Sequence, residues 1–186
     1  MKHYRDLKSS LKENEVLLHI DLAENYLSKM SKEIQIMHFG ASKSQITLHT
    51  GVYYVKQQSN PTSFCTVSDS LNHSPDGIWA YLGPVLDEIQ RHFPQIDTCT
   101  IHFFSDGPST QYRQKNNLYM FSRELEERGF KNGTWNFHES GHGKGAPDGI
   151  GGALKRAANL KVPHGKDIVN ATLMYAYMRS NKKMLK

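Results

Sequence analysis

The spacing of the apolar residues changes once along this chain, and that change limits the folds open to it. Up to residue 69 the apolar residues form short runs rich in β-branched and aromatic side chains, which is typical of strands. From Ser74 onward, runs with three- and four-residue spacing, typical of amphipathic helices, alternate with further strand-like runs. The predicted order is therefore three strands followed by helix, strand, helix, strand and helix.

This order predicts an α/β fold with a mixed five-stranded sheet flanked by helices. The first three strands follow one another closely and pair antiparallel, whereas later strands return through helices and can lie parallel to the first. The predicted strands cover residues 15–21, 45–55, 63–69, 100–106 and 134–139, with an optional strand near residue 36. The predicted helices cover residues 75–93, 116–128, 150–160 and 166–180.

The chain divides into a polar lead-in at 1–14, one domain at 15–162, and a C-terminal helix with a basic tail at 163–186. With 186 residues, 38% of them hydrophobic, it is long enough to form one compact core. The formal net charge of +5 is compatible with a polyanionic partner. No apolar run approaches the ~20 residues of a membrane span, and the N-terminus has no apolar signal region, which predicts an intracellular protein without a membrane partner.

Three aspartates stand at the points where a sheet of this kind binds ligands. Asp21 closes the first predicted strand, Asp106 closes the fourth, and Asp148 begins a helical stretch after a glycine-rich turn. Ligands bind outside the carboxyl ends of strands in such sheets. Clustered carboxylates suit Mg²⁺ or Mn²⁺, and a pair of such ions can cut or join a phosphodiester. The sequence thus predicts metal-dependent phosphoryl transfer on nucleic acid.

The element order, with acids at these points, resembles the ribonuclease-H-like catalytic domain of DDE/DDD transposases and retroviral-type integrases over roughly residues 15–160. The stretches 21–26, 104–112 and 142–152 also look like a group of transposon-derived animal proteins. The resemblance implies that Asp21, Asp106 and Asp148 bind two Mg²⁺ or Mn²⁺ ions and catalyse DNA strand cleavage and joining. It also implies a nuclear location and allows a homo-oligomer. Glu139 is the alternative third acid, because many members carry Glu at that position.

Basic residues follow the acids along the chain. Arg113 and Lys115 follow Asp106, and Lys155 and Arg156 lie on the helix that carries Asp148. They are candidates for phosphate contacts, although each taken singly is equally consistent with a solvated surface charge. The segment 141–152 contains six glycines, and His142 and Lys144 within it are further candidates. This segment fits neither the ATP nor the NAD template, so no nucleotide cofactor is expected.

Two alternatives remain open. Residues 138–142 spell H-E-x-x-H, the signature of zinc-dependent hydrolases, which requires a helix to bring His138 and His142 onto one face. Here the motif follows a strand-like run and continues into glycines, which argues against it. The other alternative is a catalytically silent, domesticated domain that keeps the fold and binds nucleic acid or acts as a scaffold.

Overall fold

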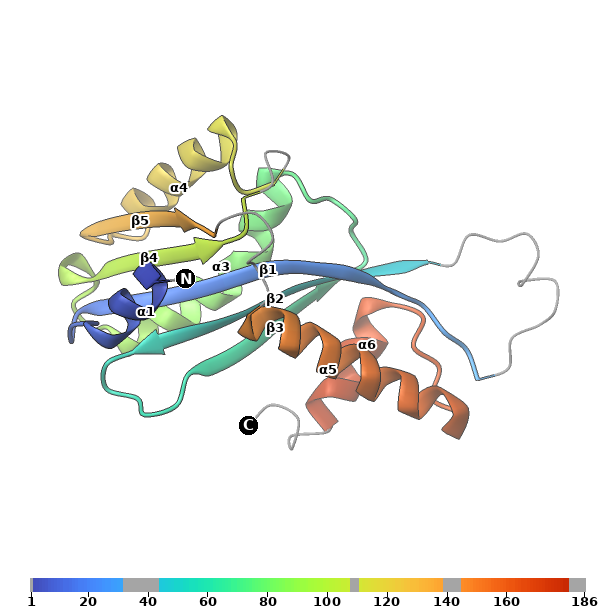
Figure 1. The fold of residues 1–186 in the computed structure, drawn as a ribbon. Helices are drawn as coiled ribbons and strands as arrows, with labels where there is room; N and C mark the ends of the chain where they lie inside the picture. The colour runs from blue at the N-terminus through green and yellow to red at the C-terminus, as the bar shows by residue number, and fades with distance from the viewer. Residues whose placement is uncertain (1, 32–43, 108–110, 139–144, 181–186) are drawn as a thin grey trace.

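The computed structural model describes residues 2–31, 44–107, 111–138 and 145–180, and its centre is a five-stranded sheet with the order β3-β2-β1-β4-β5 (Figure 1). β1 and β2 are antiparallel, as are β2 and β3, whereas β4 is parallel to both β1 and β5. This is the predicted ribonuclease-H-like arrangement, so the fold prediction is confirmed. The strands are β1 (Glu15–Leu27), β2 (Gln45–Val55), β3 (Thr62–Ser68), β4 (Thr100–Ser105) and β5 (Asn132–Phe137).

Helices cover both faces of the sheet (Figure 1). α3 and α4 share one core cluster with the residues of β1 that alternate from Val16 to Ile20. On the other face, α1 packs over Leu17 and Phe104, and α5 and α6 pack over Ile46 and Leu48. The helices are α1 (Lys2–Ser9), α3 (Pro75–His92), α4 (Lys115–Glu127), α5 (Ala146–Lys161) and α6 (Ala171–Ser180), with short 3₁₀ turns η1 (Ile96–Thr98) and η2 (Val162–His164). Because β1 is covered on both faces, its apolar run is continuous rather than alternating.

β1 is longer than the sequence predicts. Its parallel pairing with β4 ends at His19, opposite Phe104, but its antiparallel pairing with β2 continues to Leu27, with an irregularity between Ala23 and Tyr26. Asp21 therefore lies inside β1, not at its end. It nevertheless stands two residues beyond the last pair with β4, so the sheet narrows at this residue.

Three further elements have a boundary that differs from the prediction by two residues or more. α5 begins at Ala146, four residues earlier than expected. Proline is favoured in the first turn of a helix, where Pro147 lies. The glycines at 149, 151 and 152 obscure the apolar spacing of the helix in the sequence. β5 begins and ends two residues early. α6 begins only at Ala171, since Gly165, with φ 78°, stops the preceding turn. The optional strand near residue 36 lies outside the described residues.

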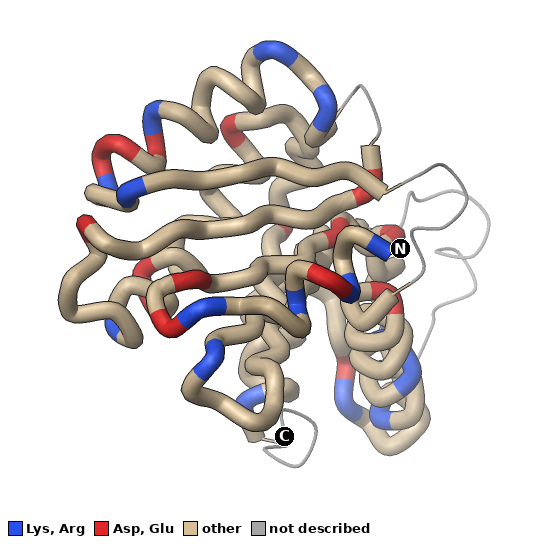
Figure 2. The backbone as a smooth tube through the Cα atoms, turned by 60° about the vertical axis from the view of Figure 1, so that its left-hand side comes forward, with Lys and Arg blue, Asp and Glu red and all other residues tan. Residues whose placement is uncertain are grey.

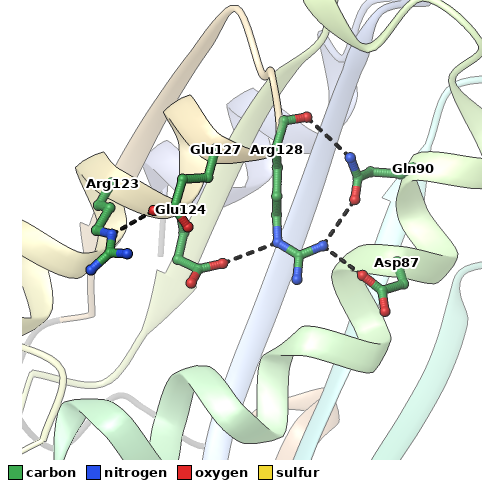
Figure 3. A network of polar contacts seen from close by, with 6 residues as sticks. All are labelled: Asp87, Gln90, Arg123, Glu124, Glu127 and Arg128. Atoms are coloured by element: carbon green, nitrogen blue, oxygen red, sulfur yellow. Dashed lines mark hydrogen bonds and ion pairs between the residues drawn. The ribbon is translucent and has the colours of Figure 1, made fainter.

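A network of ion pairs joins α3 to the end of α4 (Figure 3). The Arg128 guanidinium lies 2.6 Å from Asp87 Oδ1, 2.9 Å from Gln90 Oε1 and 3.1 Å from Glu124 Oε2. Gln90 in turn donates its amide to the Arg128 carbonyl at 3.0 Å. These contacts fix the helical layer on the face opposite α5. Within the described ranges, no helix combines the length and the apolar character that crossing a bilayer requires.

Candidate active site

The first predicted acid, Asp21, is held by the β1–β2 ladder opposite Thr50 and is partly buried. Side chains alternate along a strand, so Asp21 shares its face with His19, whereas Leu22 packs into the core beside α3. The face that carries Asp21 is the one covered by α1 and α5.

The second predicted acid, Asp106, follows β4 directly and is also partly buried. The hydroxyl of Ser105 donates to the Asp106 carbonyl at 2.7 Å, and the indole of Trp135 donates to that hydroxyl at 3.0 Å, which fixes the backbone here. The Oδ1 atom of the Asp106 side chain is buried and has no hydrogen-bond partner within the described residues.

The third predicted acid, Asp148, is the third residue of α5 and is exposed. Its Oδ2 atom accepts a hydrogen bond of 2.8 Å from the Gly145 N–H, so this carboxylate also caps the helix. A carboxylate in the first turn is favoured there by the helix dipole. Helix formation by residues 146–161 therefore fixes where Asp148 stands.

The structure brings these three carboxylates within electrostatic range of one another. Burial, then the charges of Asp106 and Asp148, raise the pKa of Asp21 to about 7, against a smaller opposing effect from the Leu22 N–H that hydrogen-bonds it. Burial and the charge of Asp148 also raise the pKa of Asp106. Residues far apart in the sequence thus form one site of repelling negative charges.

Two histidines that the sequence did not single out as partners lie beside the acids. His19 is 5% exposed, and its Nε2 atom is 3.1 Å from Nε2 of His138, which directly follows β5. Burial, then His138, lower the pKa of His19 to about 4, while Asp148 acts in the opposite direction. His138 is not on a helix, as the zinc-hydrolase arrangement would require, and the rest of that motif lies outside the described residues.

Gly145 allows the start of α5 to lie close to His19. A Cβ atom on Gly145 would lie 2.7 Å from His19 Cε1, closer than real Cβ contacts allow. The absence of a side chain here lets the N-terminus of α5, and with it Asp148, come close to β1.

The N-terminal helix α1, expected only as a polar lead-in, borders the site. The ring of Tyr4 lies 5.2 Å from that of His19 and 5.8 Å from that of His138. Lys2 and Arg5 of the same helix are exposed. One signal in the sequence could have indicated this packing, namely the apolar pair Tyr4 and Leu7 at helical spacing.

Tyr112 lies behind the acids, on the other side of the sheet. It is fully buried, and its hydroxyl is 3.1 Å from His49 Nε2. Burial, then the charges of Asp21 and Asp106, raise its pKa well above the ordinary value. The phenol therefore stays neutral and forms part of the floor of the site.

The predicted phosphate-contacting residues lie in different places. The Arg113 guanidinium is 5.8 Å from the centre of the Phe137 ring, and Lys115 begins α4; both are exposed. Lys155 Nζ is 3.5 Å from Glu24 Oε2 of β1, on the Asp148 side of α5. Arg156 lies on the flank facing β3. Glu139, His142 and Lys144 lie outside the described residues. Figure 2 shows basic residues on both helical layers rather than in one patch.

The donor set fits a hard divalent cation. Carboxylate oxygens are the ligands that Mg²⁺ and Mn²⁺ prefer. The Oδ1 atom of Asp106 has no hydrogen-bond partner among the described residues, and the pKa of Asp21 is raised. A bound cation would compensate both. Across the described residues, no three acidic, histidine or cysteine side chains are already arranged as one ligand set. The carboxylates would have to move closer together to share an ion.

The whole chain, residues 1–186, matches a family model described as "Domain of unknown function (DUF8701)". No curated protein sequence matches the chain. Among solved structures, it is similar to the crystal structure of a pre-cleavage Mos1 transpososome, with a TM-score of 0.43 at 9% sequence identity. The similarity covers 99% of this chain and 57% of that one, so this chain spans little more than half of its length. Because the family model matches every residue, the chain belongs to the DUF8701 family.

Proposed function

We propose that this chain is a divalent-metal-dependent phosphoryl-transfer domain that cleaves and joins DNA strands. The observation that carries the proposal is that the charges of Asp106 and Asp148 act on Asp21 and that the charge of Asp148 acts on Asp106. The three acids come from β1, the end of β4 and the first turn of α5. Repelling carboxylates lower the stability of a fold, so their presence together points to a function. Two partly buried acids and one exposed acid, on three separate elements, suit a shared pair of cations better than a structural role.

Asp21, Asp106 and Asp148 are the residues that would hold Mg²⁺ or Mn²⁺. In sites of this kind, bound divalent ions activate a water or a 3′-hydroxyl as nucleophile and stabilise the leaving oxygen. The chain itself supplies fixed positions: the β1–β2 ladder holds Asp21, and the cap to Gly145 holds Asp148. The rings of His19 and Tyr112 are both buried, so they are held in fixed positions near the carboxylates.

DNA as the substrate is supported by charge. The chain carries a formal +5 despite the acidic site. Arg113 follows Asp106, Lys155 lies on the Asp148 flank of α5, and Lys2 and Arg5 project from the helix that borders His19. Cations around a negative centre suit a ligand whose phosphates extend beyond the reacting bond.

The test is a plasmid-nicking and strand-transfer assay with Mn²⁺, comparing the wild type with Asp106→Asn. Asp97→Asn is the matched control, because Asp97 is exposed in η1, before β4 rather than after it. We expect metal-stimulated nicking that Asp106→Asn abolishes and Asp97→Asn retains. DNA binding without turnover in the wild type would overturn the catalytic proposal in favour of a binding domain, and nicking that survives Asp106→Asn would overturn the assigned site.

A further inference from the structure

A groove of about 510 Å³ runs between the edge strand β3 and helix α5, and the acid site makes no use of it. Its β3 wall is Ser63–Cys65, and its α5 wall is made largely of small residues, including Ala146, Ala153 and Ala157. Leu160 lies at its end and is 70% exposed. The volume falls within the ~300–1,000 Å³ range of ligand pockets, and the lining is mostly apolar.

β3 is the edge strand beside this groove. In the sheet that the described residues form, it pairs with β2 and has no strand on its other side. Its sequence, Thr62–Ser68, contains no Lys, no Pro and no acidic residue, so it lacks the charged and proline residues with which exposed edges often prevent pairing with another chain. A strand edge beside a helix with an apolar groove between them is the geometry in which an extended peptide adds to a sheet.

The groove is separate from the acid site. Residues 146, 149, 153, 157 and 160 form one flank of α5, whereas Asp148 and Lys155 point to the other flank, where Lys155 pairs with Glu24 of β1. A nucleic-acid strand bound at the acids would have to cross the helix to enter the groove. A ligand in the groove can therefore be present at the same time as DNA.

The charge of Arg156 indicates which chemical group a ligand in the groove would carry. Arg156 lines the groove, is exposed, and forms no ion pair with any other described residue. A carboxylate on the ligand would complement it. A second copy of this chain pairing through its own β3 would supply only the short side chains of Ser63, Cys65 and Val67 to the groove, and no acid.

We propose that the β3–α5 groove binds an extended peptide segment of a partner protein, which adds to β3 as a further antiparallel or parallel strand. Alternate apolar side chains of the peptide enter the groove, and an Asp, a Glu or a C-terminal carboxylate meets Arg156. The partner is thus recognised by main-chain pairing and by one apolar–acidic pattern.

The test is selection of a phage-displayed library of random peptides against the full chain, followed by binding measurements on the enriched peptides. We expect enrichment of alternating apolar residues with a nearby acid. Ala153→Phe, which fills the groove from an exposed helical position, should weaken binding at least about tenfold, as should Arg156→Glu. Asn159→Phe adds a large ring to the other flank of α5 and should bind like the wild type.

Amide hydrogen exchange of the complex checks the mode of binding. Strand addition should slow exchange within Thr62–Ser68, whereas a peptide that only packs on α5 would leave those amides unchanged and overturn the proposal. Absence of enrichment, or peptides that bind Ala153→Phe as well as the wild type, would also overturn it. Concentration-dependent dimers that Ala153→Phe disrupts would replace the partner peptide with a second copy. None of these readouts depends on nuclease activity.

Discussion

The Nε2 atoms of His19 and His138 lie 3.1 Å apart, at the edge of the proposed three-aspartate site. At that separation one ring donates its N–H to the other, and the two cannot both carry a proton on the facing nitrogens. The rings of Tyr4 and Phe104 surround the pair, so it is held in an aromatic environment that favours neutral imidazoles.

Removing His138 should raise the pKa of His19. Burial is the first cause of the low value of about 4 and the charge of His138 is the second, so His138→Ala removes only the second and leaves the pKa below its usual range. An NMR titration of the imidazole resonances measures this directly. His92→Ala, which removes a histidine bonded to Tyr53 instead, should leave the titration of His19 unchanged. An unaltered His19 titration in His138→Ala would contradict the coupling.

Mn²⁺ affinity should increase between pH 6 and pH 8. With a pKa of about 7, Asp21 is largely protonated below neutrality, and a cation must displace that proton. Below pH 7 the loss approaches about tenfold per pH unit for one displaced proton. Calorimetric titrations at several pH values test this, with Asp21→Asn expected to bind weakly and with a flatter pH dependence. Affinity that is independent of pH in the wild type would rule out Asp21 as the titrating ligand.

Asp21→Asn should stabilise the metal-free protein at neutral pH. The pKa of Asp21 is about 7 when folded against an ordinary value of 3.8, so the folded state binds more protons between those values, and its free energy of unfolding falls as pH rises from about 4 to 7. The difference between wild type and Asp21→Asn isolates this effect from the oppositely shifted histidines. After allowance for solvent screening it should be on the order of 1–2 kcal/mol at pH 8 and should vanish near pH 4. Denaturant unfolding in EDTA measures it, and equal stability at pH 8 would contradict the repulsion.

Gly145→Ala should weaken metal binding more than its neighbour Gly149→Ala. A Cβ at 145 meets His19 at 2.7 Å, so α5 must shift and take Asp148 with it; overpacking of this kind costs about 1–3 kcal/mol. A Cβ at 149 meets nothing within 4 Å, and alanine is the better helix former by about 1 kcal/mol. Thermal unfolding with and without Mn²⁺ separates the two effects. The close contact would be refuted if both variants kept the wild-type metal-induced stabilisation.

Arg128→Ala should destabilise the chain, whereas Arg123→Ala should not. Arg128 is 19% exposed and bonds three side chains of α3 and α4, whereas Arg123 is 63% exposed and pairs only with Glu127 one turn away (Figure 3). The expected loss is about 1–3 kcal/mol for Arg128, whereas Arg123→Ala should leave the unfolding midpoint at its wild-type value. Urea unfolding curves decide between them, and equal midpoints for the two variants would show that the network contributes nothing.

The order of the strands and helices was predictable because each core strand contains a run of β-branched and aromatic residues. The extension of β1 was not, because Ala23, Glu24 and Asn25 have no strand pattern, and the strand continues through an irregularity between Ala23 and Tyr26 before its pairing with β2 resumes. Asp106 was predicted to close the fourth strand, and it directly follows β4, which ends at Ser105.

The neighbourhood of the acids was harder to predict. His19 resembles an ordinary core residue of an apolar strand, and nothing local indicates that His138, more than a hundred positions away, would meet it. The closeness of Gly145 to His19 depends on how α5 docks on the sheet, which is a tertiary property. Only the alternation that puts His19 on the same strand face as Asp21 could have pointed to it.

Beyond His19, where the parallel pairing of β1 with β4 ends, the backbone of β1 forms a shelf at the site. Past that residue β1 still pairs with β2 but no longer with β4. Main-chain groups such as the Leu22 N–H, which hydrogen-bonds Asp21, therefore contribute to the site instead of pairing with β4. A shelf made of backbone survives the loss of any acid above it. We therefore expect that replacing the aspartates would remove the proposed turnover and leave the backbone shelf in place, so that ligand binding and turnover are lost separately.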